Sequence, residues 1–119
     1  MSAPTGEQAA LGRSGAAINL DELVLCFRLH ANLARASVLI AHDRECAAWF
    51  LQVARAAVEE PDAPLPSEVL RELHRLLDVA VRSLESGDVA GADSATALAE
   101  GLCVVRMLRR ASSPQRSPA

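Results

Sequence analysis

Two pairs of sulfur and imidazole side chains stand four residues apart in the chain. Cys26 precedes His30, and His42 precedes Cys46. Four residues are about one turn of an α-helix, so each pair would share a helix face. Thiolate and imidazole together suit zinc or copper, so a Cys/His metal site is one hypothesis. The competing interpretation is that the cysteines are small buried hydrophobic residues, since no Cys-x-x-Cys motif accompanies them.

Histidine phosphotransfer is a second hypothesis, because an exposed histidine on a helical bundle can accept a phosphoryl group. His74 falls on the polar face of its segment, and His42 is followed by an acidic residue, as in kinase phosphoacceptor helices. The residues that follow His42 and His74 do not match those of known phosphoacceptor helices, and no lysine is present anywhere in the sequence. Two solvated surface histidines are therefore the favoured interpretation.

The sequence shows no motif of nucleophilic catalysis. It contains no Gly-rich phosphate loop and no Gly-x-Ser-x-Gly elbow, so we expect no enzyme, no catalytic residue and no cofactor. The net charge of −3 argues against nucleic-acid binding, which needs an excess of basic residues. We interpret the arginines at 106, 109 and 110 as favourable cations at a helix C-terminus.

The composition favours a single helical domain. Half of the 119 residues are hydrophobic but only 3% are aromatic, so alanine, leucine and valine supply the apolar side chains. This excludes an all-β fold and a wholly disordered chain. Arg28 and Arg35 interrupt the most apolar segment, so we expect no membrane span. The bias to arginine is one that a GC-rich bacterial genome produces, and three cysteines outside a disulfide framework indicate a cytoplasmic location.

Hydrophobic periodicity predicts four helices, over residues 20–41, 43–59, 67–86 and 88–110. Asn19 and Glu22 have the spacing of a capping box ahead of the first helix. A proline-rich segment ends the second helix, and Ser67 is expected to cap the third. Gly87 is expected to end the third helix and Asp88 to cap the fourth.

The apolar register changes near residue 43, which leaves two interpretations of residues 20–59. Either one helix of about 60 Å spans them, or a tight turn separates two antiparallel helices. We favour the turn, with Asp43 as the next N-cap, because so long a helix exceeds a compact domain of this size.

Four helices joined by short connections predict a small up-down four-helix bundle over residues 18–111, with flexible tails at 1–17 and 112–119. This layout, with its turn at Gly87-Asp88, resembles that of the small helical chaperones that hold flagellar or type III export substrates. The resemblance covers layout only. It implies a protein-binding function.

The first helix carries more apolar surface than one bundle position requires. One stripe comprises Leu20, Val24, Phe27, Ala31, Ala34, Val38 and Ala41. A second stripe beside it comprises Cys26, Leu29, Leu33, Ala36 and Ile40. We expect the second stripe to be the surplus surface that meets a partner, unless this helix lies at the centre of the bundle.

Two further features favour a binding surface. Trp49 and Phe50 are adjacent, so one should face the core and the other a partner. The fourth helix has a face of small residues that permits close helix packing. The sequence therefore predicts a non-enzymatic module, adaptor or export-chaperone-like, that binds a partner helix or a second copy of itself. The expected contact residues are Cys26, Leu29, Leu33, Ile40, Trp49, Gly91 and Ala95.

Overall fold

A computed structural model describes residues 19–112, and the side chains of residues 19–109. Its helices are α2 (Leu20–Leu39), α3 (Arg44–Val58), α4 (Ser67–Glu85) and α5 (Val89–Ser112). The described part of the chain contains no strand, which confirms the predicted all-α four-helix class. The predicted tail at 1–17 lies outside the described residues, as does the predicted C-terminal tail after Ser112.

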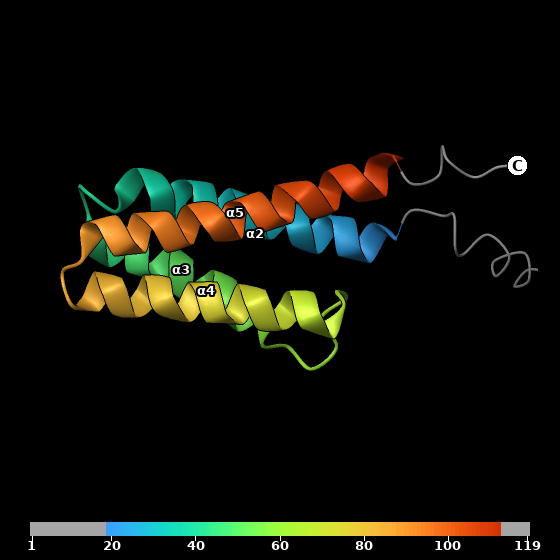
Figure 1. Ribbon diagram of the computed structural model, residues 1–119, viewed down its shortest axis with the longest axis horizontal. Coiled ribbons are helices and arrows are strands. Elements are labelled where there is room, and N and C mark those ends of the chain that lie inside the picture. The colour runs from blue at the N-terminus through green and yellow to red at the C-terminus, as the bar shows by residue number, and fades with distance from the viewer. Residues whose placement is uncertain (1–18, 113–119) are drawn as a thin grey trace, which may run out of the picture.

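The four helices form an up-down bundle (Figure 1). Each helix packs against two others: α2 and α4 both contact α3 and α5. The α2–α3 and α4–α5 turns lie at one end of the bundle, and the α3–α4 loop lies at the other. Because consecutive helices run in opposite directions, α2 and α5 are antiparallel neighbours although they are farthest apart in sequence.

The core consists mainly of leucine and alanine. On α4 the buried residues form one apolar stripe: Leu73, Leu76, Leu77, Ala80, Val81 and Leu84. On α5 the buried positions are smaller: Ala92, Ala95, Thr96, Ala99 and Cys103. The sequence analysis expected the small-residue face of this helix to meet a partner, but the structure places small side chains such as Ala95 in the core.

On α2 the structure reverses the expected roles of the two apolar stripes. Cys26, Leu29, Leu33, Ala36 and Ile40, predicted to meet a partner, are all at most 3% exposed and belong to the core. The stripe that runs from Leu20 to Val38 points away from the bundle. The expectation was wrong because both stripes are apolar, and only contact with α3 and α5 decides which one is buried.

Side-chain caps begin three of the helices as predicted. The side chain of Asn19 accepts the N–H of Glu22, that of Asp43 accepts the N–H of Cys46, and that of Asp88 accepts the N–H of Gly91. The Asp43 cap confirms that residues 20–59 form two helices rather than one. The expected cap at Ser67 is wrong. Helix α4 already includes that residue, and Pro66 precedes it without a side-chain cap bond.

The Asp43 cap depends on pH. The hydrogen bond from the Cys46 N–H lowers the pKa of the Asp43 carboxyl. A lowered folded-state pKa means that the cap stabilises the fold above the ordinary aspartate pKa. This stabilisation is lost as the pH falls through the lowered value.

Gly87 ends α4 through backbone geometry that favours glycine. Its φ of +83° is left-handed, and the N–H of Asp88 donates to the carbonyl of Ser83 over 2.8 Å. The N–H of Gly87 itself donates to the carbonyl of Leu84 over 3.1 Å. This pair of bonds is the Schellman arrangement, and it reverses the chain into α5.

Candidate interaction surface

The outer face of α2 is apolar along its whole length. We call Leu20, Val24, Phe27, Ala31, Ala34 and Val38 the outer α2 stripe. Leu20 and Val38 are each 69% exposed, and Phe27 is 67% exposed. Val24 is 53% exposed, whereas Ala31 and Ala34 are half-buried. Burying one large apolar side chain is worth about 1.5–3 kcal/mol, so several exposed ones on a single helix face are a feature of binding surfaces.

The adjacent helix α5 also carries exposed apolar residues. We call its exposed, uncharged residues Ala97, Leu98, Gly101, Val105 and Leu108 the outer α5 face. A Cβ atom at Gly101 would meet no other helix within 4 Å, so the outer side of α5 is open at this position.

An ion pair and a histidine–carboxylate contact connect α5 to α2. Nε of Arg106 lies 2.8 Å from Oε2 of Glu22, and Nε2 of His30 lies 3.2 Å from Oε2 of Glu100. The pairs set the antiparallel register, in which residue 30 is level with residue 100. Glu22 is 2% exposed, so its pair with Arg106 is shielded from water.

Sequence reasoning missed the Glu22–Arg106 pair. It assigned Glu22 to a capping box and Arg106 to the helix dipole, because both positions are near helix ends. A usable signal was present, since Glu22, Cys26 and His30 recur every four residues and so follow one side of the helix. Charged and polar residues at that spacing indicate a neighbouring helix with complementary groups.

Two cysteines lie in the same α2–α5 contact, and both are buried. Burial is the main cause that raises the pKa of the Cys26 thiol, and the Glu22 carboxylate adds to the effect. Burial also raises the pKa of Cys103 to about 12, with smaller contributions from Cys26 and Glu100. At neutral pH both groups are therefore protonated thiols, which are weak nucleophiles and poor metal ligands.

A thiol-labelling experiment checks this placement. We expect one of the three cysteines, the exposed Cys46, to react rapidly with a thiol reagent at pH 8, and Cys26 and Cys103 to react only on unfolding. The hydrogen bond with Asp43 is the main cause that raises the pKa of Cys46, so Asp43→Asn should accelerate its labelling. Rapid labelling of two or three thiols in the folded protein would contradict the burial of Cys26 and Cys103.

Thr96 is buried on α5, and its hydroxyl has no hydrogen-bond partner among the described residues. A buried hydroxyl without a partner costs stability, whereas a methyl group of similar size does not. We therefore expect Thr96→Val to raise the free energy of unfolding by about 1 kcal/mol, measured by urea denaturation. Thr96→Ser keeps the hydroxyl and should be less stable than the wild type. A lower free energy of unfolding in Thr96→Val would contradict the conclusion that the Thr96 hydroxyl has no hydrogen-bond partner.

The structure separates the residues of the hypothetical metal site. Cys26 is in the core, whereas His42 and Cys46 are exposed at the α2–α3 turn. Sixteen residues of chain separate Cys26 from His42, which corresponds to about 24 Å along a helix. Within the described residues, no group of three or more His, Cys, Asp or Glu side chains is arranged to hold a metal ion. The Cys/His metal-binding alternative therefore has no geometric support.

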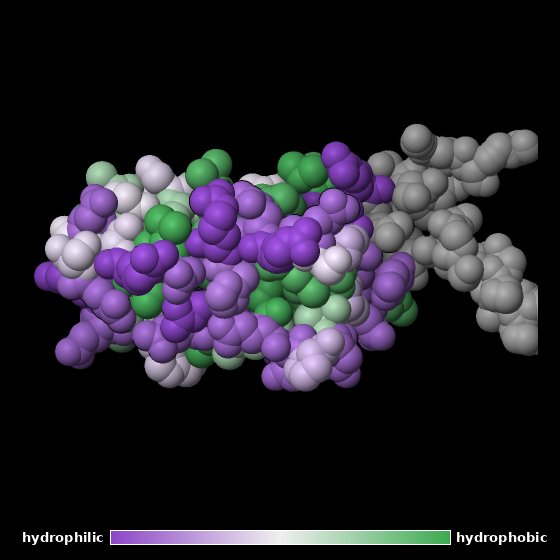
Figure 2. Space-filling view, turned by 60° about the horizontal axis from the view of Figure 1, so that its bottom comes forward, coloured by the Kyte–Doolittle hydropathy of each residue, from purple (hydrophilic) through white to green (hydrophobic). Residues whose placement is uncertain are grey.

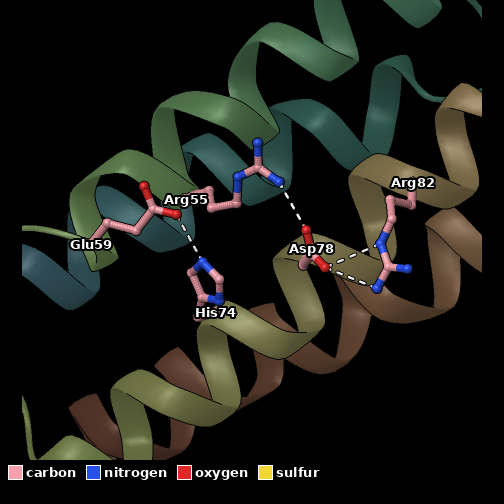
Figure 3. Close-up of polar contacts among 5 residues, drawn as sticks. All are labelled: Arg55, Glu59, His74, Asp78 and Arg82. Atoms are coloured by element: carbon pink, nitrogen blue, oxygen red, sulfur yellow. Dashed lines mark hydrogen bonds and ion pairs between the residues drawn. The ribbon is translucent and has the colours of Figure 1, made fainter.

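The two histidines of the phosphorelay hypothesis also lack a suitable setting. His42 lies in the turn between α2 and α3 rather than on a helix. His74 is on α4, where its Nε2 atom lies 2.8 Å from Oε2 of Glu59 (Figure 3). A carboxylate at this distance would repel an incoming phosphoryl group.

The same polar contacts continue along α3 and α4. The carboxylate of Asp78 forms ion pairs with Arg55 at 3.0 Å and with Arg82 at 2.8 Å (Figure 3). Figure 2 shows the side of the molecule at the bottom of Figure 1, where hydrophilic side chains predominate and apolar areas lie between them. On this side Arg55 of α3 pairs with Asp78 of α4, whereas the outer α2 stripe contains no charged residue.

Three predicted contact residues lie on other helices. Trp49 is exposed on α3, and its ring packs edge-on against the half-buried Phe50, with 5.1 Å between the ring centroids. This matches the expectation that the two rings point in different directions, and a partner at Trp49 stays a prediction. Ala95 is in the core, which corrects its assignment as a contact residue. The backbone of Gly91 donates to the Asp88 cap, and a Cβ there would meet the cap carboxylate.

None of the helices within residues 19–112 has the length and apolar character needed to cross a membrane. Comparisons of the chain with protein-family models, with curated proteins and with solved structures gave no match.

Proposed function

We propose that this protein is a small, non-enzymatic helical module, adaptor or export-chaperone-like, that binds a protein partner through the outer α2 stripe and the outer α5 face. The observation that carries the proposal is the exposure of Leu20, Phe27 and Val38 on one apolar helix face. Surface positions of a stable bundle do not require large hydrophobic residues, and such a row is costly unless a partner covers it.

The chemistry of the partner follows from this surface. The outer α2 stripe is uncharged, and its residues recur every three or four positions. A surface of this kind fits the apolar face of another helix. A net charge of −3 disfavours nucleic acid as the partner. All three cysteines are free thiols, which is typical of proteins in a reducing compartment. We therefore infer that the protein acts in the cytoplasm.

Site-specific photo-crosslinking in cells tests the proposal. The photoreactive amino acid p-benzoylphenylalanine would replace Phe27 in the full chain, and the matched control would carry it at the exposed Arg71 on α4. We expect a covalent adduct with a protein at position 27 and none at position 71. Absence of any adduct at position 27, or equal adducts at both positions, would refute the proposed function.

A further inference from the structure

We infer that the partner on the outer α2 stripe is a second copy of this chain, with the two α2 helices antiparallel and a two-fold axis level with residue 29. This inference rests on the proposed function and specifies its partner.

The positions of the stripe are symmetric about residue 29. Leu20 and Val38 lie nine residues on either side, Val24 and Ala34 lie five, and Phe27 and Ala31 lie two. When a helix faces an antiparallel copy of itself, residues equally far from the axis are level with one another. All six stripe residues therefore face another stripe residue, and none faces a polar position.

The sizes of the facing residues are complementary. Phe27 meets Ala31 of the second copy, Val24 meets Ala34, and Leu20 meets Val38. Each layer thus combines a larger with a smaller side chain, which fills space evenly between two helices. In a parallel pair, Phe27 would face Phe27 while Ala31 faced Ala31, so crowded layers would alternate with gaps. Side-chain size therefore favours the antiparallel arrangement.

The charged edge of the stripe favours the same arrangement. Asp21, Arg28 and Arg35 recur every seven residues and lie along one edge of α2. The guanidinium of Arg35 is positioned 5.9 Å from the centroid of the Phe50 ring. In the antiparallel pair Asp21 lies within about 3 Å of the level of Arg35 on the second copy, which creates two opposite-charge contacts. Arg28 lies near the two-fold axis, beside Arg28 of the second copy, and this like-charge contact opposes association.

The available area is close to that of a stable interface once α5 is included. The outer face of α2 is about 30 Å long and 10 Å wide, or about 300 Å² in projection. A standard interface buries about 800 Å² per partner, so α2 alone is too small. Adding the outer α5 face doubles the projected area to about 600 Å². Gly101 is one residue from Glu100, which pairs with His30 at the level of the axis, and its missing side chain lets the second α5 approach.

Disulfide crosslinking between two differently marked copies tests this geometry. In a Cys46→Ser background of the full chain, Leu20→Cys protein would be mixed with Val38→Cys protein and oxidised, and Ala56→Cys on the exposed face of α3 would replace Val38→Cys as the control. We expect a 20–38 crosslinked dimer and no 20–56 product. A dimer formed by the Leu20→Cys protein alone would indicate parallel helices and overturn the inference. Circular dichroism checks that each variant keeps its helices.

Light scattering on the wild-type full chain gives a second, independent measurement. We expect a dimer mass at high concentration, and Phe27→Asp should raise the dissociation constant at least about 30-fold. Gln52→Asp, an exposed control on α3, should leave the dissociation constant unchanged. A monomer at every concentration would overturn the inference.

The photo-crosslink at position 27 separates failure of this inference from failure of the proposed function. An adduct of twice the chain mass supports both. An adduct of any other mass overturns the second copy as partner but keeps the proposed function. Absence of an adduct overturns both.

Discussion

Leu33→Ala is expected to lower the free energy of unfolding by about 3 kcal/mol, because Leu33 is fully buried and its truncation leaves a cavity in the core. Phe27→Ala, on the same helix, removes a larger side chain that is 67% exposed. We expect this second change to cost less than about 0.5 kcal/mol in the monomer. Urea denaturation at a protein concentration where light scattering shows a monomer measures both values.

The comparison decides which apolar stripe of α2 is the core. Leu29→Ala repeats the test at a second buried position, and Val38→Ala repeats it at a second exposed one. If the exposed stripe were in fact the core, Phe27→Ala would cost more than Leu33→Ala. That reversed order would also remove the surface on which the proposed function depends.

The second large effect concerns the shielded ion pair between α2 and α5. Arg106→Met takes the guanidinium away from the Glu22 carboxylate, which is 2.8 Å away and buried. A buried carboxylate that loses its cation is destabilising, so we expect a loss of about 3 kcal/mol in the free energy of unfolding. This is a large part of the stability of a small domain.

The control is an ion pair of similar geometry on the surface. Arg82→Met breaks the exposed pair with Asp78, and we expect a cost below about 1 kcal/mol. In the double variant Glu22→Leu, Arg106→Met both charges are absent, so stability should exceed that of Arg106→Met alone. Equal losses for Arg82→Met and Arg106→Met would contradict the shielding of the Glu22–Arg106 pair.

Much of the fold could be predicted from the sequence because its signals are local. Asn19, Asp43 and Asp88 bond to N–H groups three residues ahead, and the left-handed backbone of Gly87 ends α4 within its own turn. The single polar face of α4 determined its core side as well. These features depend on neighbours in the chain, and the structure confirms each of them.

The candidate site could be predicted only in part. The sequence showed that the helix over residues 20–39 has surplus apolar surface, but Leu29 and Phe27 are equally hydrophobic in isolation. The sequence also showed that Glu22 and Arg106 are charged, but they are 84 residues apart and meet only when α5 packs beside α2.

By itself, therefore, the sequence determined that residues 19–112 form four helices, where the side-chain caps of three of them lie, and that one helix is apolar on more than one side. Only the tertiary structure decided that Cys26, Leu29 and Leu33 face inward and that Leu20, Phe27 and Val38 face outward. The physical reason is that local hydrogen bonds and periodicity depend on nearby residues. Which apolar face is buried depends instead on the fit of one helix against two others.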